Sequence, residues 1–371
     1  MTATPRDALN GTLTDTLTLA ADIGRVAAEH DAEHDRDATF VTEAYDAMHA
    51  SGYLRLAVPT DLGGGGATMR DLVLAQHELG RYSGAAALSS TMHHYLTLVQ
   101  VWRRRRGAAD AEAILAKVTD GLVMATSGGS DWVCPTTVAT EVEGGYLLTG
   151  RKVFCSQAPV AGVVSTSAVL GEPGPGATVL HAGVPLSSPG VSIVETWDTL
   201  GMRGTASHDL VLEDVFVPAE KVAGTRPYGE LVGPLLVAAI HFAPLAGAAY
   251  LGVAAGACDQ AIRLAKPGST RQVGEMRSRL RVALWGLLAA VEEIGEDPAA
   301  DEASLETVML AKRHAVNEAR AVVDIALEVA GGSAFFRGSP IERAYRDVRG
   351  GPFHPLTPEA TLELVGRRAL G

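Results

Sequence analysis

The chain has 371 residues, 47% of them hydrophobic, which is enough apolar material for a large folded core. Its formal net charge is −12, from 31 basic and 43 acidic residues, so we expect no nucleic-acid partner, because nucleic-acid binders present a basic surface. The three cysteines, Cys134, Cys155 and Cys258, are widely spaced and follow no metal-binding pattern. We therefore expect no metal and, in the absence of an export signal, a reducing cytoplasmic location.

Residues 1–120 are predicted to form a helical domain. Apolar side chains recur at helical spacing through residues 17–27, 40–49, 69–79 and 85–102. Glycine-containing breaks at 52–59 and 63–66 separate these helices. The second break is not a phosphate loop, because no Lys-Ser/Thr pair follows it and no strand precedes it. The arginines at 103–106 end the last long helix, where they complement its dipole.

Residues 121–225 alternate between apolar and polar, which predicts an antiparallel β domain, a small barrel or sandwich. A hairpin is expected from strands at 136–141 and 146–150, followed by strands at 163–169, 177–184 and 191–194. The stretch 197–220, WDTLGMRGTASHDLVLEDVFVPAE, predicts a polar loop carrying Arg203, Thr205 and Ser207, then a strand and a turn at 213–214. Such loops often display binding groups.

Residues 226–371 return to helical spacing, with helices expected at 231–266, 274–293, 304–330, 341–348 and 358–369. The first contains 28 residues, 231–258, without a charged side chain, which is long enough to cross a bilayer. Its internal prolines and the lack of flanking aromatic anchors favour the centre of a helical bundle, so we expect no membrane contact. The whole chain therefore predicts an α+β fold.

Four sequence motifs resemble the acyl-CoA dehydrogenase superfamily. LGMRGTASHDL at 200–210 with VPAE at 217–220 resembles its signature, and TSGGSD at 126–131 resembles a shortened flavin loop. YLLTGRKVFCS at 146–156 resembles its flavin-facing strand, and EVAGG at 328–332 with IERAYRD at 341–347 resembles its adenine-side turn and Arg-Asp anchor. The resemblance implies an N-terminal helical domain, a middle antiparallel β domain, a C-terminal four-helix bundle and a bound flavin.

The resemblance also implies which residues bind the flavin. Phe154 matches the aromatic residue that packs on the isoalloxazine, and Ser156 matches the hydroxyl that contacts nitrogen 5; both share one face of a strand. The other cofactor-binding positions are Thr126, Ser127, Ser130, Thr205, Ser207, Gly331, Gly332 and Thr357. A reshaped segment at 266–272 leaves FAD and FMN both open, and leaves the expected homo-oligomer, a dimer or tetramer, undecided. The structural alternative for Thr126, Ser127 and Ser130 is a solvated turn, and for Thr205 and Ser207 it is a role in bracing their own loop.

The carboxylate that an acyl-CoA dehydrogenase needs is missing from its usual positions. Such an enzyme removes a proton with a Glu nine residues after the Arg of the Arg-Asp anchor, which here is Pro355. The second family position falls near His241 and Phe242, again without a carboxylate. Glu359 is the one displaced candidate, and it equally suits the first turn of a helix.

GGPFHP at 350–355 resembles the C-terminal segment of the group D flavin-dependent monooxygenases, which receive reduced flavin from a separate reductase and form a flavin C4a-hydroperoxide with dioxygen. Neutral His and Ser suit that chemistry, because they hydrogen-bond without placing a permanent charge in a dry pocket. The predicted catalytic residues are His93, Ser156 and His354. His94 is the alternative to His93, since adjacent helical residues point about 100° apart.

The sequence therefore favours the oxygenase component of a two-component monooxygenase. Its substrate would be a small molecule, aromatic or amine, or a carrier-bound intermediate, and its partner a separate flavin reductase. The alternative is an acyl-CoA or acyl-carrier dehydrogenase with a displaced base. A flavin-binding homologue without turnover is the third reading.

Overall fold

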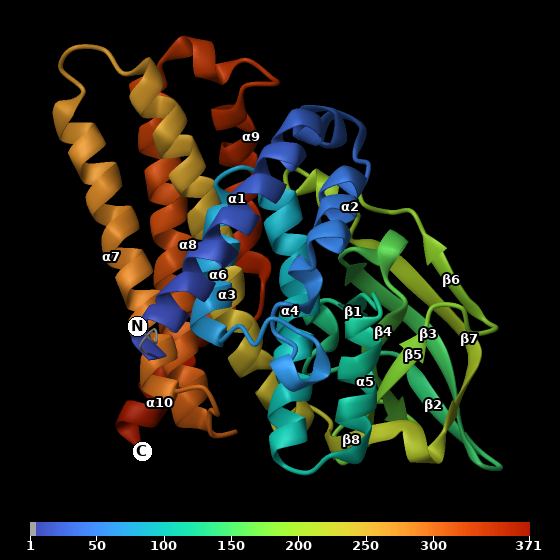
Figure 1. The fold of residues 1–371 in the computed structure, drawn as a ribbon. Helices are drawn as coiled ribbons and strands as arrows, with labels where there is room; N and C mark the ends of the chain where they lie inside the picture. The colour runs from blue at the N-terminus through green and yellow to red at the C-terminus, as the bar shows by residue number, and fades with distance from the viewer. Residues whose placement is uncertain (1–4) are drawn as a thin grey trace.

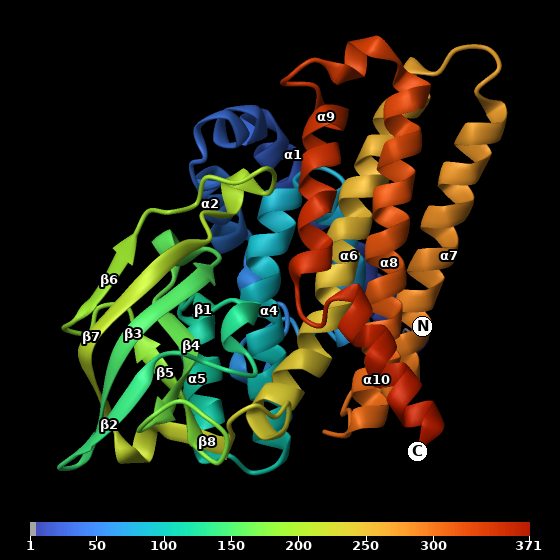
Figure 2. The same ribbon diagram turned by 180° about the vertical axis from the view of Figure 1, so that it is seen from behind.

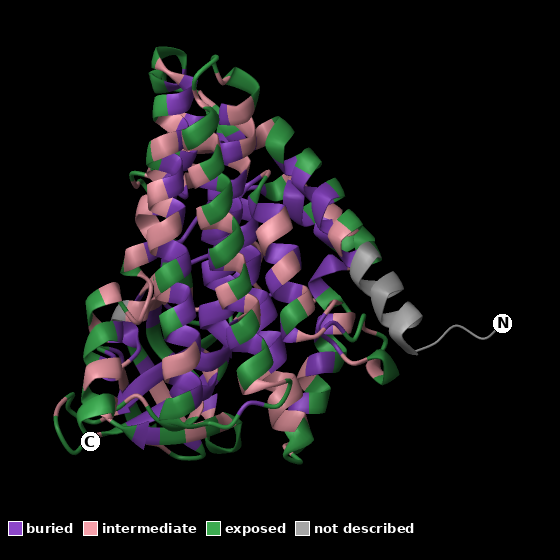
Figure 3. Ribbon diagram, turned by 90° about the vertical axis from the view of Figure 1, so that its left-hand side faces the viewer, coloured by how far each residue is buried: buried purple, intermediate pink, exposed green. Residues whose placement is uncertain are grey.

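A computed structural model describes the backbone from residue 5 onward and the side chains of residues 15–129 and 131–371. Three parts follow one another in the predicted order, helical, β and helical, and the sheet packs beside the helices rather than between them (Figure 1). The α+β fold class and the acyl-CoA dehydrogenase-like architecture are thereby confirmed. Buried residues fill the interior between the helices, and exposed ones cover their outer faces (Figure 3).

The N-terminal part consists of five helices: α1 (Pro5–Asp37), α2 (Thr42–Ser51), α3 (Met69–Gly80), α4 (Gly84–Arg105) and α5 (Ala109–Thr119). Local chemistry fixes several of their ends. Thr68 and Asp71 form a reciprocal capping box at the start of α3, and Ser83 caps α4. Gly52 ends α2 with φ 77°, a left-handed conformation that favours glycine. The predicted helices at 40–49, 69–79 and 85–102 match α2, α3 and α4.

The described strands form one eight-stranded sheet in the order β6-β7-β3-β2-β4-β5-β8, with β1 paired to β4. Its strands are β1 (Met124–Thr126), β2 (Val138–Val142), β3 (Gly145–Cys155), β4 (Val163–Leu170), β5 (Thr178–Pro185), β6 (Val191–Val194), β7 (His208–Pro218) and β8 (Val222–Pro227). Most neighbours are antiparallel, as predicted, but β4 runs parallel to both β1 and β2. The sequence prediction missed β8, whose alternation is short and interrupted by Gly224.

The turn expected at 213–214 is not a turn. β7 continues through it as one strand, and Asp214 adopts φ 50° where two residues of β7 oppose one of β3, between the Leu148–Val215 and Gly150–Leu212 pairs. This is a β-bulge, which inserts a residue without ending the strand. The sequence signal of two consecutive acidic residues is the same for both, and only the pairing with β3 distinguishes them.

The C-terminal part comprises α6 (Gly233–Leu264), α7 (Thr270–Ile294), α8 (Glu302–Ala330), α9 (Pro340–Asp347) and α10 (Pro358–Leu370). Helix α6 lies behind α8 and α9 in the bundle (Figure 2). By length and composition α6 could cross a membrane, but 94% of its most apolar window is buried inside the fold. An all-round apolar helix at the centre of a bundle is the predicted arrangement.

Candidate functional site

Three hydroxyl side chains meet where the end of β3 approaches the loop before β7. Ser156 Oγ lies 2.7 Å from Ser207 Oγ, which lies 2.7 Å from Thr205 Oγ1. Thr205 Oγ1 in turn donates to the Met202 carbonyl oxygen at 2.9 Å. All three hydroxyl residues are buried, with 6% exposure or less. The tertiary structure thus brings together predicted residues that are about fifty positions apart in sequence.

The backbone around these hydroxyls is strained. Phe154, Gln157, Met202 and Ala206 all have positive φ values, between 41° and 59°, although none is a glycine. The left-handed conformation costs an L-residue about 1–2 kcal/mol, and such residues concentrate at functional sites. Four of the six described non-glycine residues with positive φ lie in this one place. The concentration marks it as the candidate site.

Phe154 forms an aromatic wall beside the hydroxyls. Its side chain is 51% exposed, and its ring stands edge-on to Trp197 with centroids 5.8 Å apart. The loop at 126–131, which resembles a shortened flavin loop, packs against Phe154. Gly128 N donates to Val153 O at 2.8 Å, and a Cβ on Gly128 would lie 2.5 Å from Phe154 Cβ. Only a glycine permits this approach. That Phe154 and Ser156 bound one surface stays a prediction, because Phe154 adopts φ 58° and Ser156 lies beyond the end of β3, so strand alternation does not put them on one face.

A buried ion pair attaches the same loop to β3. Lys152 Nζ donates to Asp131 Oδ2 at 2.6 Å and also to the Ser167 carbonyl oxygen. Lys152 is fully buried, and desolvation lowers its pKa although Asp131 opposes the shift. Ser127 and Thr126 lie on this loop; Ser127 Oγ is 3.5 Å from Thr166 Oγ1, and Thr126 Oγ1 donates to Ser127 O at 3.3 Å. The Ser127 contact is long, so its hydroxyl keeps capacity for a ligand.

The segment after α9 closes the site from the helical side. The ring of His354 accepts or donates one hydrogen bond through Nε2, to the Tyr250 hydroxyl at 2.8 Å. Lys312 Nζ donates to three successive carbonyl oxygens, those of His354 at 2.7 Å, Pro355 at 3.0 Å and Leu356 at 2.8 Å. The Pro355 ring lies against Gly129, where a Cβ would be 2.4 Å from its Cδ. The loop bearing His354 is thus fixed to the loop at 126–131.

The two positions at which relatives keep a catalytic carboxylate converge here. Phe242 on α6 and His354 have ring centroids 5.7 Å apart, and Phe242 also contacts Tyr95 and Trp132 edge-on. Imidazole, phenol and phenyl groups therefore occupy the space. Burial and the neighbouring Lys312 cation lower the pKa of His354 to about 3, so its ring is neutral at physiological pH. Glu359 lies exposed in the first turn of α10.

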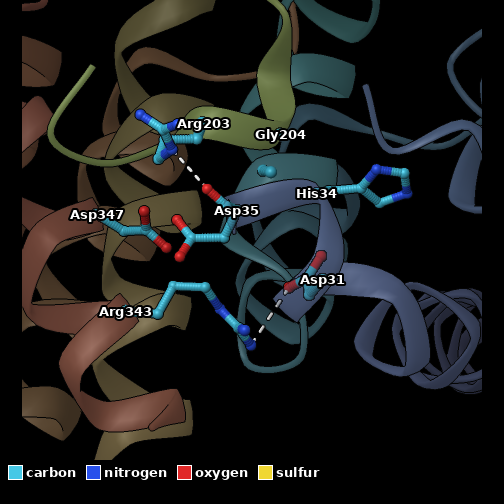
Figure 4. Close-up of a pocket in the computed structure, with 8 residues that line it drawn as sticks. Asp31, His34, Asp35, Arg203, Gly204, Arg343 and Asp347 are labelled. Carbon is cyan, nitrogen blue, oxygen red and sulfur yellow. Dashed lines mark hydrogen bonds and ion pairs between the residues drawn. The ribbon is translucent and has the colours of Figure 1, made fainter. Parts of the chain in front are cut away.

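A cluster of charged side chains holds the loop that carries Met202 and Ala206. Arg346 donates to both carboxylate oxygens of Asp35, at 2.5 and 2.8 Å, and Asp347 accepts from the backbone N–H of Met202. Arg203 donates to the Asp35 carbonyl oxygen, and Arg343 is paired with Asp31 at 3.7 Å (Figure 4). Burial raises the pKa of Asp347 to about 7 and that of Asp31 to about 6.

The pocket among these side chains has a volume of about 10 Å³, room for one water molecule at most. The cluster therefore braces the site and is itself too small for a substrate. Arg203 belongs to this brace, which is the structural alternative that the sequence left open for it.

Two backbone groups hold the ring of His93. Its Nε2 is 2.6 Å from the Leu54 carbonyl oxygen, and its Nδ1 accepts from the Met124 backbone N–H at 3.1 Å. Both ring nitrogens are occupied, and burial lowers its pKa to about 4. Action of His93 on the flavin or substrate stays a prediction, although these two contacts leave the ring no free nitrogen. His94 is fully buried with neither nitrogen hydrogen-bonded, edge-on to Tyr53 rather than beside the hydroxyls.

The remaining predicted residues are not drawn into the hydroxyl cluster. Gly331 and Gly332 follow the last residue of α8 and begin the connection to α9. Thr357 is exposed and caps α10 by accepting from Ala360 N at 3.3 Å. The side chain of Ser130 lies outside the described residues. Cofactor binding by these four residues stays a prediction.

Sequence reasoning missed three residues that shape the site: Trp197, Tyr250 and Lys312. Lys312 carried a usable signal, because it falls on the apolar stripe of α8 with Val308, Ala315 and Ala319. A lysine on a buried helix face needs partners for its charge. Tyr250, one aromatic residue in a long apolar run, carried none.

The arrangement fits a flavin ring system. A flavin needs a flat apolar wall, polar groups at its edge and close backbone approach. Phe154 supplies an exposed aromatic wall, and Ser156 supplies a polar atom just beyond the end of the same strand. In the described residues no group of His, Cys, Asp and Glu is arranged to hold a metal ion.

Family models match three stretches of the chain: the acyl-CoA dehydrogenase N-terminal domain at 19–104, the middle domain at 125–215 and the C-terminal domain at 245–358. The chain belongs to the acyl-CoA dehydrogenase family.

Among curated proteins it is similar to the amino sugar nitrososynthase DnmZ of Streptomyces peucetius, with 30% identity over 91% of this chain and 89% of that protein. It is also similar to the putative acyl-CoA dehydrogenase YdbM of Bacillus subtilis, with 29% identity over 94% of this chain and 95% of that protein.

Among solved structures it is similar to KijD3 in complex with FMN and dTDP-3-amino-2,3,6-trideoxy-4-keto-3-methyl-D-glucose. The TM-score is 0.85 and the identity 27%, over 100% of this chain and 95% of that one. These likenesses confirm the predicted class, a flavin-dependent enzyme of the oxygenase branch of this fold.

Proposed function

We propose that this protein is the oxygenase component of a two-component system that oxidises the nitrogen of an amine, with an amino sugar nucleotide as the preferred substrate class. A separate reductase supplies reduced FMN in this proposal. When bound, reduced flavin supplies the two electrons with which dioxygen is activated, one oxygen atom going to the amine and the other to water. We place the enzyme in the cytoplasm as a homo-oligomer.

One observation carries the proposal: His354, Tyr250 and Phe242 occupy the space where both family positions for the carboxylate meet. Without a carboxylate, the site has no group to remove the α proton of an acyl thioester. The His354 imidazole is itself neutral, because its pKa is about 3. The amine that is oxidised is the neutral form, because only that form has a free lone pair on nitrogen.

The chain's own residues have separate tasks. Phe154 and the loop at 126–131 bind the ring and its edge, and Ser156 meets the ring beside Phe154. Tyr250 fixes the His354 imidazole through Nε2, which leaves Nδ1 available to the substrate or to reduced oxygen. Phe242, Trp132 and Tyr95 exclude water from the helical side. Arg346 and Asp347 hold the loop that presents the hydroxyls.

The test uses the purified protein with FMN, NADH, a flavin reductase and air, and a panel of dTDP-amino sugars and simple alkylamines. We expect reductase-dependent and oxygen-dependent formation of a product 16 mass units heavier than an amine, or 14 for a nitroso product. The variant His354→Ala should reduce it at least about tenfold, whereas His314→Ala, on the exposed face of α8, should not.

The competing dehydrogenase is tested in the same preparation. Anaerobic addition of short-chain and long-chain acyl-CoA thioesters to the FMN-loaded or FAD-loaded protein should leave the flavin absorbance unchanged. Bleaching by a thioester, and its loss in Glu359→Gln, would replace the oxygenase proposal with a dehydrogenase that uses a displaced base.

A further inference from the structure

The hydroxyl chain has a fixed direction. A carbonyl oxygen only accepts hydrogen bonds, so the 2.9 Å contact between Thr205 Oγ1 and Met202 O requires the Thr205 hydrogen to lie between them. Thr205 has one hydroxyl hydrogen, and its oxygen must therefore accept from Ser207 across 2.7 Å. Ser207 is likewise left as an acceptor for Ser156 at 2.7 Å. Each hydroxyl hydrogen therefore points along the chain toward Met202.

Burial keeps this order in place. Thr205 is fully buried, Ser207 is 3% exposed and Ser156 is 6% exposed, so bulk water does not reach the inner links. Within the described residues, these three side-chain oxygens have no hydrogen-bond partners besides one another and Met202 O. Consecutive hydrogen bonds in a low-dielectric interior also strengthen one another. The Ser156 oxygen is consequently presented outward with lone pairs and without its hydrogen.

An acceptor at this point distinguishes the two redox states of a flavin. Nitrogen 5 of oxidised flavin carries a lone pair, whereas nitrogen 5 of reduced flavin carries a hydrogen. A lone pair facing the Ser156 oxygen is repelled, and an N–H is bound. A Ser156 free to rotate would instead offer its hydrogen to the oxidised form.

We propose that Ser207 and Thr205 are positioning residues that orient Ser156 as a hydrogen-bond acceptor, and that this makes the site select reduced over oxidised flavin. The proposal rests on the proposed function, which places Ser156 at the flavin. It goes further by assigning the selectivity to two residues behind Ser156. An oxygenase served by a separate reductase benefits from such a preference, because oxidised flavin is then released for the next reduction.

The experiment measures dissociation constants of oxidised FMN in air and of dithionite-reduced FMN under anaerobic conditions. For the unchanged protein we expect tighter binding of reduced FMN. In Ser207→Ala, Ser156 loses its acceptor and turns its hydrogen outward, so the ratio of the two constants should fall about tenfold. That corresponds to a decrease of about 30 mV in the potential of the bound two-electron couple.

Two Thr205 variants provide the matched comparison. Thr205→Val removes the link to Met202 O and should also lower the ratio, whereas Thr205→Ser keeps a donor and an acceptor and should preserve it. Thermal unfolding of each variant checks that it is folded. Thr205→Ser tests the assignment even if the valine variant does not fold.

The proposal is overturned if the unchanged protein shows no preference, or if Ser207→Ala weakens both redox forms equally, as a purely structural serine would. The outcomes separate it from the proposed function. If amine oxidation with the reductase proceeds and Ser207→Ala leaves the ratio unchanged, only the positioning role fails. If neither form of FMN binds to the unchanged protein, both proposals fail together.

Discussion

Tyr250→Phe isolates the hydrogen bond that orients His354. The Tyr250 hydroxyl is its one described ring partner, 2.8 Å from Nε2, on a side chain that is 1% exposed. Losing a buried hydrogen bond costs about 0.5–1.5 kcal/mol, and leaving the ring nitrogen unpaired costs about 1–3 kcal/mol. If about 1.4 kcal/mol of this orients the imidazole, the fraction of correctly placed His354 falls about tenfold. We expect the yield of oxidised amine per reduced flavin to fall by a similar factor.

The assay measures amine product and hydrogen peroxide per NADH consumed, with Tyr53→Phe as the control. Tyr53 is fully buried and donates to Gln76 at 2.7 Å, so the two variants lose comparable bonds. Both should lower the free energy of unfolding by about 1–3 kcal/mol. Only Tyr250→Phe should divert reduced flavin from product to peroxide. Equal coupling in the two variants would refute the positioning of His354 by Tyr250.

Three further predictions concern the loops and the buried charges. Gly129→Ala should weaken FMN binding at least tenfold, because its Cβ would meet the Pro355 ring; an FMN titration measures this. Gly286→Ala is the control, because no atom lies within 4 Å of its added Cβ. It should raise the free energy of unfolding by about 0.5–1 kcal/mol, which urea unfolding measures. Lys312→Met should increase hydrogen exchange of the backbone amides at 354–356, since three carbonyls lose their common donor; unchanged exchange would contradict that role. Acid should destabilise the fold: burial lowers the pKa of five histidines to about 3 or 4, so unfolding takes up their protons as the pH falls from 6.5 to 4. The pKa values of Asp31 and Asp347 are raised to about 6 and 7, so these two groups release protons on unfolding and cancel two of the five protons taken up. A net uptake of three protons lowers the free energy of unfolding by at most about 4 kcal/mol per pH unit near pH 5. A urea midpoint that rises from pH 7 to pH 5 would contradict this sign.

The sequence by itself determined the order of helical, β and helical parts, because hydrophobic periodicity is a local property that each segment carries alone. It also placed Phe154 and Ser156 close together at the end of one strand, because a single short motif carries both. The vacancy at Pro355 followed from spacing within the C-terminal segment. These are short-range relations that a single chain displays directly.

Only the tertiary structure decided what the polar side chains do. His93 and Ser156 are both polar residues that the sequence proposed for the site. Both ring nitrogens of His93 are bonded to the backbone of Leu54 and Met124, whereas the Ser156 hydroxyl contacts Ser207. The direction of the hydroxyl chain depends on Met202 O and Ser207, which the loop before β7 brings to the end of β3. Hydrogen-bond partners are chosen by proximity in space, and sequence spacing does not record which donors and acceptors burial leaves within reach.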